Sequence, residues 1–352
     1  MARAKTRSPF RSSSRTLGTV TATALTICGL LTGTAAAAEA PAAAGTATTA
    51  SAEPAVGASA VPAHAVTGYW QNFDNGAAKQ KLSDVPDDYD IIAVSFADAT
   101  GTPGQVDFTL DPATGYGSED EFKADIEAKH AAGKSVIVSV GGEKGAVSVA
   151  DDASATAFAD SVVGLMDEYG FDGVDIDLEN GLNSTYMTKA LDSIHSRKND
   201  VVVTMAPQTI DMQSTSTEYF KTALNIKDYL TVVNMQYYNS GSMNGCDGKV
   251  YSQGSVDFLT ALACIQLEGG LDASQVGLGT PASPSAAGSG YVEPGVVTAA
   301  VDCLTKGSNC GSFKPAETYP GLRGAMTWST NWDASNGNSW SGTVGPHVDA
   351  LG

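Results

Sequence analysis

The sequence predicts an α/β fold in which eight parallel strands close into a single-domain (β/α)8 barrel, the TIM barrel. Eight short runs of apolar and β-branched residues recur along the chain, and segments with helical periodicity separate most of them. The chain beyond about residue 65 also has the usual length of one large barrel, and no second change of composition interrupts it. An open, doubly wound sheet is the alternative fold that the same alternation allows.

The apolar runs are the expected strands, because β-branched side chains pack well on a pleated surface. They are Ala65–Trp70, Ile91–Phe96, Ser135–Val140, Gly173–Glu179, Val201–Ala206, Thr231–Tyr238, Val276–Thr280 and Arg323–Ser329. The expected helices lie between them, where apolar residues recur every three or four positions: Glu119–Ala132, Ala153–Tyr169, Ser184–Arg197, Thr217–Leu224, Val256–Leu267 and Gly295–Leu304. The Gly-rich turn from Gly141 to Gly145 lacks the spacing of a phosphate-binding loop, so we expect a tight loop at the barrel rim.

The segment before the barrel predicts export. Basic residues at positions 3, 5, 7, 11 and 15 precede an uncharged run from Leu17 to Leu31 and small residues from Thr34 to Ala38. This order is typical of a secretory signal peptide over residues 1–38, so the protein is expected to be secreted and extracellular. A lipid anchor on Cys28 is the alternative, although Ile27 is too bulky for the residue before such a site. Residues 39–65, rich in Ala, Thr and Pro, are expected to be a flexible spacer, and residues 66–352 the catalytic barrel.

Charge and cysteine content narrow the range of partners. The chain has 20 basic and 39 acidic side chains; residues 1–65 hold five and two of these, so the rest carries 15 against 37, a net charge of about −22. Nucleic acids and anionic membranes are poor partners, because binding to them starts from a basic surface, whereas a neutral polymer remains open. Of the three pairings open to the four cysteines beyond the leader, the simplest by spacing is Cys246 with Cys264 and Cys303 with Cys310. With no C-x-x-C pair and scattered histidines, no zinc site is expected.

Three acids dominate the fourth expected strand. Because side chains alternate between the faces of a strand, Asp175, Asp177 and Glu179 share one face, while Asp172 falls on the other and is expected to be structural. A row of ionised carboxylates is costly to bury, since each repels the next. In a parallel barrel the catalytic groups lie at the carboxyl ends of the strands, and Glu179 holds that position.

Aromatic and polar residues stand at the ends of other strands. They are Tyr69 and Trp70 on the first, Met205 and Gln208 around the fifth, Gln236, Tyr238 and Asn239 on the sixth, and Trp328 on the eighth. Taken singly, each aromatic residue is more often part of a core, but their common place at one end of the barrel favours a site. Aromatic faces stack on sugars, and a carboxyl group kept protonated by neighbouring negative charge is a general acid, so the set suggests a glycosidase. A Ca²⁺ or Mg²⁺ site is the alternative, but alternation spreads the acids along a line.

Several short motifs at these strand ends match one known family. They are Asp172-Gly-x-Asp175-x-Asp177-x-Glu179, Ser139-Val-Gly141-Gly142, Met205-Ala-Pro-Gln208, Gln236-Tyr-Tyr238-Asn239 and Met326-Thr-Trp328-Ser. The first carries every defining position of the family-18 glycoside hydrolases, the chitinases and their relatives, which the chain resembles from Tyr69 to Trp328. The third and fourth resemble the hevamine-like branch. Asn239 stands where other chitinases of the family have Asp.

This resemblance implies substrate-assisted catalysis, in which the family differs from ordinary retaining glycosidases. Glu179 would protonate the glycosidic oxygen and later activate water, while the sugar's own 2-acetamido oxygen attacks the anomeric carbon and forms an oxazolinium. Asp177 would orient the acetamido group and share a proton with Asp175, and Tyr238 would hold the acetamido oxygen. Trp328 would be the floor of the subsite, and its other lining residues would be Tyr69, Met205, Gln236 and Asn239.

The implied activity is that of a secreted, endo-acting chitinase. Many bacterial relatives insert an α+β subdomain after the seventh strand, but the stretch from Thr280 to Val296 has no room for one, so we expect an open groove and internal cuts. The expected partner is chitin or a chitooligosaccharide, and the protein is expected to be a monomer without metal or other cofactor. Two alternatives remain: an endo-β-N-acetylglucosaminidase acting on N-glycans, against which Leu178 argues, and a non-catalytic chitin-binding lectin, against which the intact Glu179 argues.

Overall fold

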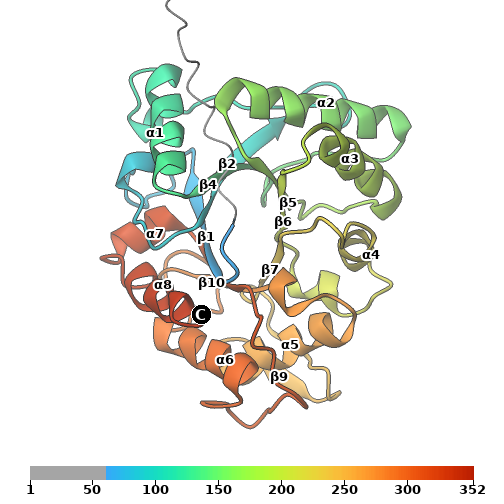
Figure 1. Cartoon of the computed structure of the whole chain (residues 1–352), viewed down its shortest axis with the longest axis vertical. Helices are drawn as coiled ribbons and strands as arrows, with labels where there is room; N and C mark the ends of the chain where they lie inside the picture. Colours follow the sequence, from blue (N-terminus) through green and yellow to red (C-terminus); the bar gives the residue numbers. More distant parts are fainter. Residues whose placement is uncertain (1–60) are drawn as a thin grey trace, which may run out of the picture. The chain divides into compact units, whose positions relative to one another are not determined.

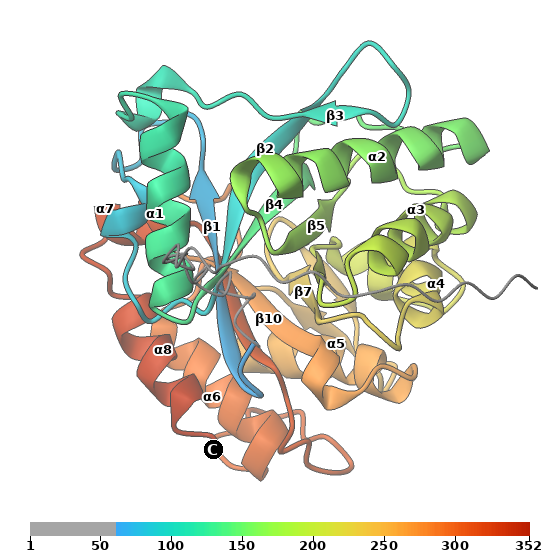
Figure 2. The ribbon, with the colours of Figure 1, turned by 45° about the horizontal axis from the view of Figure 1, so that its top comes forward.

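The structure, a computed structural model, describes residues 61–352. Eight parallel strands stand around a central axis (Figure 1), and helices surround them (Figure 2). The strands are β1 (Ala65–Gln71), β2 (Ile91–Ala99), β4 (Ser135–Gly141), β5 (Gly173–Asp177), β6 (Val202–Met205), β7 (Val232–Gln236), β10 (Val276–Pro281) and β11 (Gly324–Trp328). Their hydrogen-bonded order is β1-β11-β10-β7-β6-β5-β4-β2, and β2 pairs with β1, so the sheet closes. The expected single-domain (β/α)8 barrel is confirmed, and the open sheet is wrong.

Helices follow most of the strands and form the outer layer. They are α1 (Glu119–Ala131), α2 (Asp152–Tyr169), α3 (Ser184–Arg197), α4 (Glu218–Asn225), α5 (Val256–Glu268), α6 (Pro294–Lys306), α7 (Thr330–Ser335) and α8 (Ser341–Asp349). All six expected helices are present, with ends that differ by at most two residues, whereas α7 and α8 were not expected. The 3-10 turns are η1 (Leu82–Asp84), η2 (Pro112–Thr114), η3 (Thr209–Met212) and η4 (Ala273–Gln275), and the connection from β1 to β2 contains η1 in place of a helix.

Capping side chains explain where the first three helices begin. Ser118, Asp151 and Asn183 precede α1, α2 and α3, and the side chain of each accepts a hydrogen bond from a backbone N–H in the first turn. Such caps satisfy donors that a helix leaves unpaired at its start. Gly170 ends α2 with φ +80°, a conformation that favours glycine.

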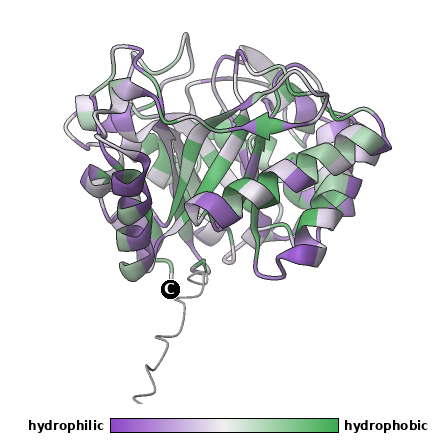
Figure 3. Cartoon of the chain, turned by 90° about the horizontal axis from the view of Figure 1, so that it is seen from above, coloured by the Kyte–Doolittle hydropathy of each residue, from purple (hydrophilic) through white to green (hydrophobic). Residues whose placement is uncertain are grey.

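The strands are buried on both faces. Inside the barrel lies a small apolar cluster: Tyr69, Ile91, Ala93, Ile137, Val202, Ala206, Val232 and Met326. The alternate residues of the same strands, such as Trp70, Val138 and Val203, belong to a larger cluster beneath the helices. In Figure 3 the central strands carry much of the apolar colouring, and the outer helices show both apolar and polar residues. This double burial is typical of parallel strands and explains their nearly continuous apolar runs.

Three short strands of the described part of the chain lie outside the eight strands of the barrel. Strands β8 (Ser242–Asn244) and β9 (Val250–Ser252) form a hairpin between β7 and α5, and β3 (Val106–Asp107) pairs antiparallel with β2. The disulfide Cys246–Cys264 ties the hairpin to α5, and Cys303–Cys310 closes a short loop, so both expected pairs form. Between β10 and α6 the chain forms no helix or strand, which confirms the absence of an insertion subdomain at this position.

Ordered contacts begin earlier than the expected barrel boundary at residue 66. Ala65 already belongs to β1, and two residues expected in the spacer contact the segment just before β11. His64 Nδ1 lies 2.8 Å from Leu322 O, and Arg323 Nη1 donates to Pro62 O at 2.5 Å. The expected signal peptide, Cys28 and residues 39–60 lie outside the described part of the chain. No helix within residues 61–352 combines the length and apolar character needed to cross a membrane.

Candidate active site

Strand β5 places the acids at the carboxyl end of the barrel. The strand ends at Asp177, whose carbonyl oxygen accepts a hydrogen bond from Gly142 N at 2.7 Å. We expected the strand to continue to Glu179, but Leu178 and Glu179 lie beyond it, because the pairing with β4 and β6 stops before them. The sheet therefore fixes Asp175 and Asp177, and other contacts have to place Glu179.

Asp175 is fully buried among hydroxyl groups. Its Oδ2 accepts hydrogen bonds from Tyr69 Oη at 2.8 Å and Ser139 Oγ at 2.7 Å, and its Oδ1 accepts one from Thr204 Oγ1 at 2.6 Å. Burial raises the pKa of Asp175, while the three donors oppose that shift because they stabilise the charged form.

Asp177 has fewer hydrogen-bond donors than Asp175 to offset the cost of its burial. Its Oδ1 accepts one hydrogen bond, from Gln236 Nε2 at 2.9 Å. Burial raises the pKa of Asp177 well above its usual range, and the negative charges of Asp175 and Glu179 raise it further. Among the hydrogen bonds of the described residues, none joins Asp175 to Asp177. The charge of Asp175 therefore favours the protonated form of Asp177.

Glu179 is partly exposed and lies between two glutamines. Gln236 Nε2 is 3.4 Å from its Oε1, and Gln208 Nε2 is 3.4 Å from its Oε2. Burial raises the pKa of Glu179; the two glutamines oppose the shift, and the charges of Glu143 and Asp211 add to it. A carboxyl group with a raised pKa and access to solvent can deliver a proton to a ligand.

Two tyrosines face the acids from different elements. Tyr69, near the end of β1, donates to Asp175. Tyr238 lies two residues beyond β7 and is 8% exposed, and no hydrogen bond of its hydroxyl to the described residues is present. Burial raises the pKa of Tyr238 well above its ordinary value, and the charges of Asp177, Glu179 and Asp175 raise it further. Its hydroxyl therefore keeps its proton and is available as a donor.

An aromatic cluster borders the same opening. Trp328, the last residue of β11, is partly exposed, and its ring centroid lies 5.8 Å from that of Tyr69. The rings of Phe96 and Phe73 stack against Trp328, with centroids 5.8 Å and 6.3 Å away. Phe73 and Phe96 also stack on each other, so three partly exposed rings form one apolar surface beside the acids. Such a surface suits the C–H face of a sugar.

Two of the expected lining residues lie elsewhere. Met205 is fully buried in the cluster beneath the helices, so it does not face the acids. The reason is the strand alternation itself: Thr204 points inward to Asp175, and Met205 therefore points outward. Asn239 is exposed, has φ +52°, and its Oδ1 accepts a hydrogen bond from Ser289 N at 3.0 Å. It holds the loop after β10 and does not contact the acids.

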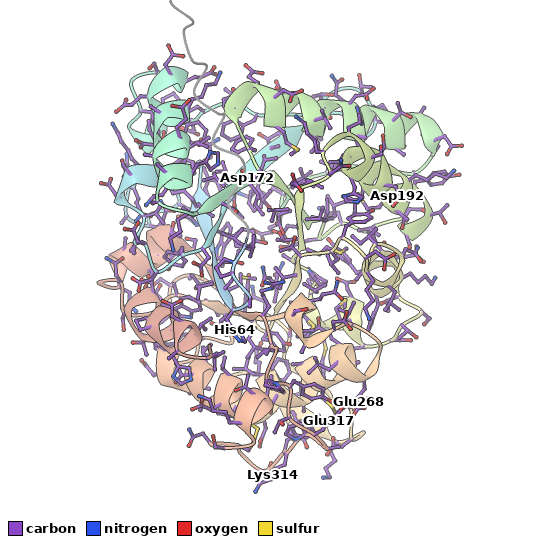
Figure 4. All side chains as sticks on the ribbon, in the orientation of Figure 1. His64, Asp172, Asp192, Glu268, Lys314 and Glu317 are labelled. Atoms are coloured by element: carbon purple, nitrogen blue, oxygen red, sulfur yellow. A yellow bond between two sulfur atoms is a disulfide. The ribbon has the colours of Figure 1, made fainter. Side chains whose placement is uncertain are left out.

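Asp172 supports the structure, as its place on the other face suggested. Its Oδ2 accepts a hydrogen bond from Val136 N at 2.7 Å and lies 2.8 Å from His130 Nε2. Figure 4 shows Asp172 close to the strands and Asp192 on the outer helix α3.

Other residues at the site were not assigned from the sequence. Thr204 could have been found, since alternation puts it on the face of Asp175 one strand away. Gln208 was noticed at a strand end and in a motif but was given no role, and its contact with Glu179 depends on the turn that leads into η3. Tyr219 on α4 contacts the backbone next to Glu179, and no local pattern links the two.

One group of possible metal ligands comes together within residues 61–352. It consists of Cys246, Cys264 and Glu268. Both sulfur atoms are committed to a disulfide, so they are not available as thiolate ligands.

Comparison with known proteins agrees with this geometry. Residues 65–344 match the family model described as glycosyl hydrolases family 18. A Streptomyces coelicolor protein, provisionally identified as chitinase A, is 72% identical and aligns with a TM-score of 0.81 over 82% of this chain and 99% of that chain. A GH18 chitinase from Chromobacterium violaceum is 35% identical, with a TM-score of 0.76 over 82% of this chain and 84% of that chain.

Among curated relatives, Exochitinase 1 of Streptomyces olivaceoviridis is 36% identical over 330 residues. The match covers 80% of this chain and 55% of the relative, so the chain spans about half the length of that protein. Because the family model matches most of the sequence and the acid row lies where the barrel opens, the chain belongs to the glycosyl hydrolases of family 18.

Proposed function

We propose that the chain is an endo-acting chitinase that cleaves β-1,4 bonds between N-acetylglucosamine units with retention of configuration. The observation that carries the proposal is the shared amide of Gln236, which contacts both Asp177 and Glu179 beside the free hydroxyl of Tyr238. In this arrangement Glu179 can donate a proton, and Asp177 and Tyr238 can form hydrogen bonds with an acetamido substituent. The names of the similar proteins support chitin as the substrate class.

Glu179 begins the reaction as a general acid. Its raised pKa keeps the proton available, and the proton passes to the glycosidic oxygen as the bond from that oxygen to the anomeric carbon breaks. The carbonyl oxygen of the sugar's own 2-acetamido group forms the new bond to the anomeric carbon, which gives a cationic oxazolinium. Glu179, now a carboxylate, takes a proton from water, and the water oxygen bonds to the anomeric carbon from the face that the leaving group occupied. The bond from the anomeric carbon to the acetamido oxygen breaks, so the ring opens with retention of configuration.

Asp177 and Tyr238 act on the acetamido group. Asp177 accepts a hydrogen bond from its N–H, which orients the carbonyl oxygen for attack, and the hydroxyl of Tyr238 donates to that oxygen. The three hydroxyls around Asp175 favour its charged form, so of the two acids Asp177 is the one that holds a proton at rest. The negative charge of the pair then stabilises the oxazolinium as it develops.

The expected endo mode and location also belong to this proposal. The short connection between β10 and α6 supports an open groove and internal cuts, although Exochitinase 1 carries the opposite mode in its name. The basic, apolar and small-residue order of residues 1–38 supports secretion. We further propose that the protein acts as a monomer on chitin or chitooligosaccharides.

The decisive variant is Glu179→Gln, which keeps the shape of the side chain and removes its proton chemistry. Turnover of chitin oligomers should fall by about 10²- to 10⁴-fold, while oligomer binding, measured by calorimetry, should change little. Near-normal turnover would refute the assignment of Glu179.

A product profile tests the substrate and the mode of action. Soluble chitin, chitosan and a high-mannose glycan are offered side by side, and products are sized over time. The proposal expects a spread of chitin oligomers at early times. Release of one short product from the start contradicts the endo mode, and cleavage of the glycan alone favours the endo-β-N-acetylglucosaminidase alternative.

A further inference from the structure

The hydroxyl of Tyr219 lies against the backbone that carries Glu179. Tyr219 is the second residue of α4 and is 3% exposed. Its hydroxyl oxygen accepts a hydrogen bond from Leu178 N at 2.6 Å and donates to Leu178 O at 3.1 Å. Ile176 O, at 3.5 Å, is the more distant acceptor, so Leu178 O is the better partner for the single hydroxyl proton.

Leu178 is the link between the last paired residue of β5 and Glu179. Gly142 N donates to Asp177 O, and Ala206 N donates to Ile176 O, so the bonds from both neighbouring strands end before Leu178. The residue is itself 3% exposed, which keeps water away from its backbone. Buried backbone groups need partners, and one tyrosine hydroxyl satisfies both the N–H and the C=O of this residue.

The carboxylate of Glu179 is held more loosely than its backbone. Its two contacts with glutamines are each 3.4 Å long, near the limit for a hydrogen bond. By contrast, α4 is well anchored next to Tyr219, because Glu218 Oε2 accepts a hydrogen bond from Ser184 N at 2.8 Å. A fixed helix thus holds the backbone one residue before a loosely held acid.

We propose that Tyr219 is a positioning residue for Glu179: its hydroxyl fixes the backbone of Leu178 and thereby sets how far the acid reaches toward the scissile bond. The proposal rests on the proposed role of Glu179. It predicts that loss of the hydroxyl harms proton transfer and leaves the binding of the sugar chain intact, since the aromatic surface and Tyr238 lie at the ends of other strands.

The test is Tyr219→Phe, which removes one oxygen atom and keeps the ring. We expect kcat on a fluorogenic chitin oligomer to fall by about 10- to 100-fold, because a misplacement of about 1 Å has that effect on a positioned group, while KM changes little. Tyr89→Phe is the matched control. Tyr89 is equally buried and donates to Asp333 at 2.8 Å, far along the chain from β5, so its loss should lower Tm and leave kcat unchanged.

The outcomes separate the two proposals. If Y219F loses only stability, as Y89F should, or if KM rises while kcat is unchanged, the positioning role is refuted. If Glu179→Gln retains turnover, the role of the acid itself fails, whatever Y219F does.

A measurement on the unmodified protein covers the case in which Y219F does not fold. Hydrogen exchange of the Leu178 amide, followed by mass spectrometry with small peptides, should be among the slowest in the chain. Exchange as fast as that of exposed loop amides would overturn the proposal.

Discussion

The two tyrosines beside the acids should separate stability from catalysis. Tyr69 and Tyr238 are both buried, but only the hydroxyl of Tyr69 has a protein partner among the described residues, the carboxylate of Asp175. Replacing each by Phe removes the same hydroxyl oxygen, once where it donates to a carboxylate and once where it does not. A hydrogen bond to a charged group contributes about 1.5–3 kcal/mol, so Y69F should lower the free energy of unfolding by about that amount.

Y238F leaves no group of the described part of the chain unpaired, so its unfolding free energy should change by less than about 0.5 kcal/mol. In the proposed mechanism, however, this hydroxyl donates to the acetamido oxygen that attacks. Loss of such a donor lowers kcat by about 10²- to 10³-fold. Y69F acts on the reaction only through Asp175, so its kcat should fall less than that of Y238F.

Thermal melts and steady-state kinetics on a fluorogenic chitin oligomer measure both effects. One kcal/mol corresponds to about 2–4 °C in Tm for a domain of nearly this size, so Y69F should melt about 3–12 °C lower and Y238F within about 2 °C of the parent protein. Unchanged kcat in Y238F would refute its role. Equal losses of Tm in the two variants would refute the claim that the hydroxyl of Tyr238 has no partner within residues 61–352.

Two further predictions concern charge and covalent links. Asp211→Asn keeps an acceptor for Gln208 N, which lies 3.2 Å from Asp211, but removes a negative charge that helps to raise the pKa of Glu179. The pKa of Glu179 should fall, so the alkaline limb of the kcat/KM profile, where the acid loses its proton, should move to lower pH. The control is Asp200→Asn, which replaces an exposed acid before β6 and should leave the alkaline limb in place. A shift of the limb to higher pH in Asp211→Asn would contradict this account. Replacing Cys246 and Cys264 by Ser should lower the unfolding free energy by about 3.2 kcal/mol, and replacing Cys303 and Cys310 by about 2.4 kcal/mol, because the first pair closes 18 residues and the second 7. Urea titrations would check the order, and a larger loss for the second pair would show that loop entropy does not dominate.

The sequence predicted the regular parts of the fold well because each has a local cause. Helix α3 begins and ends where expected, since Asn183 caps it and its apolar residues repeat with helical spacing. The end of β5 was placed too late, because the alternation of acids and apolar residues continues through Glu179 although the neighbouring strands stop pairing. The short helices α7 and α8 follow the last strand without a long periodic run, so no expectation covered them.

The residues of the candidate site also fall into those that local sequence predicts and those that it does not. Alternation along single strands correctly puts Asp175, Asp177 and Gln236 inside the barrel. The same alternation places Met205 outside, but the family motif led us to expect Met205 in the subsite. The contacts of Gln208 and Tyr219 depend on how a turn and a helix pack against β5, and nothing in their local sequence encodes that distance.

The apolar filling of the barrel has a consequence for proton traffic. Below the acids the interior is closed by Ile91, Ile137, Val202, Val232 and Met326, none of them more than 5% exposed. Solvent therefore approaches the acid pair from the mouth of the barrel, where Glu179 is partly exposed and where the proposed substrate would bind.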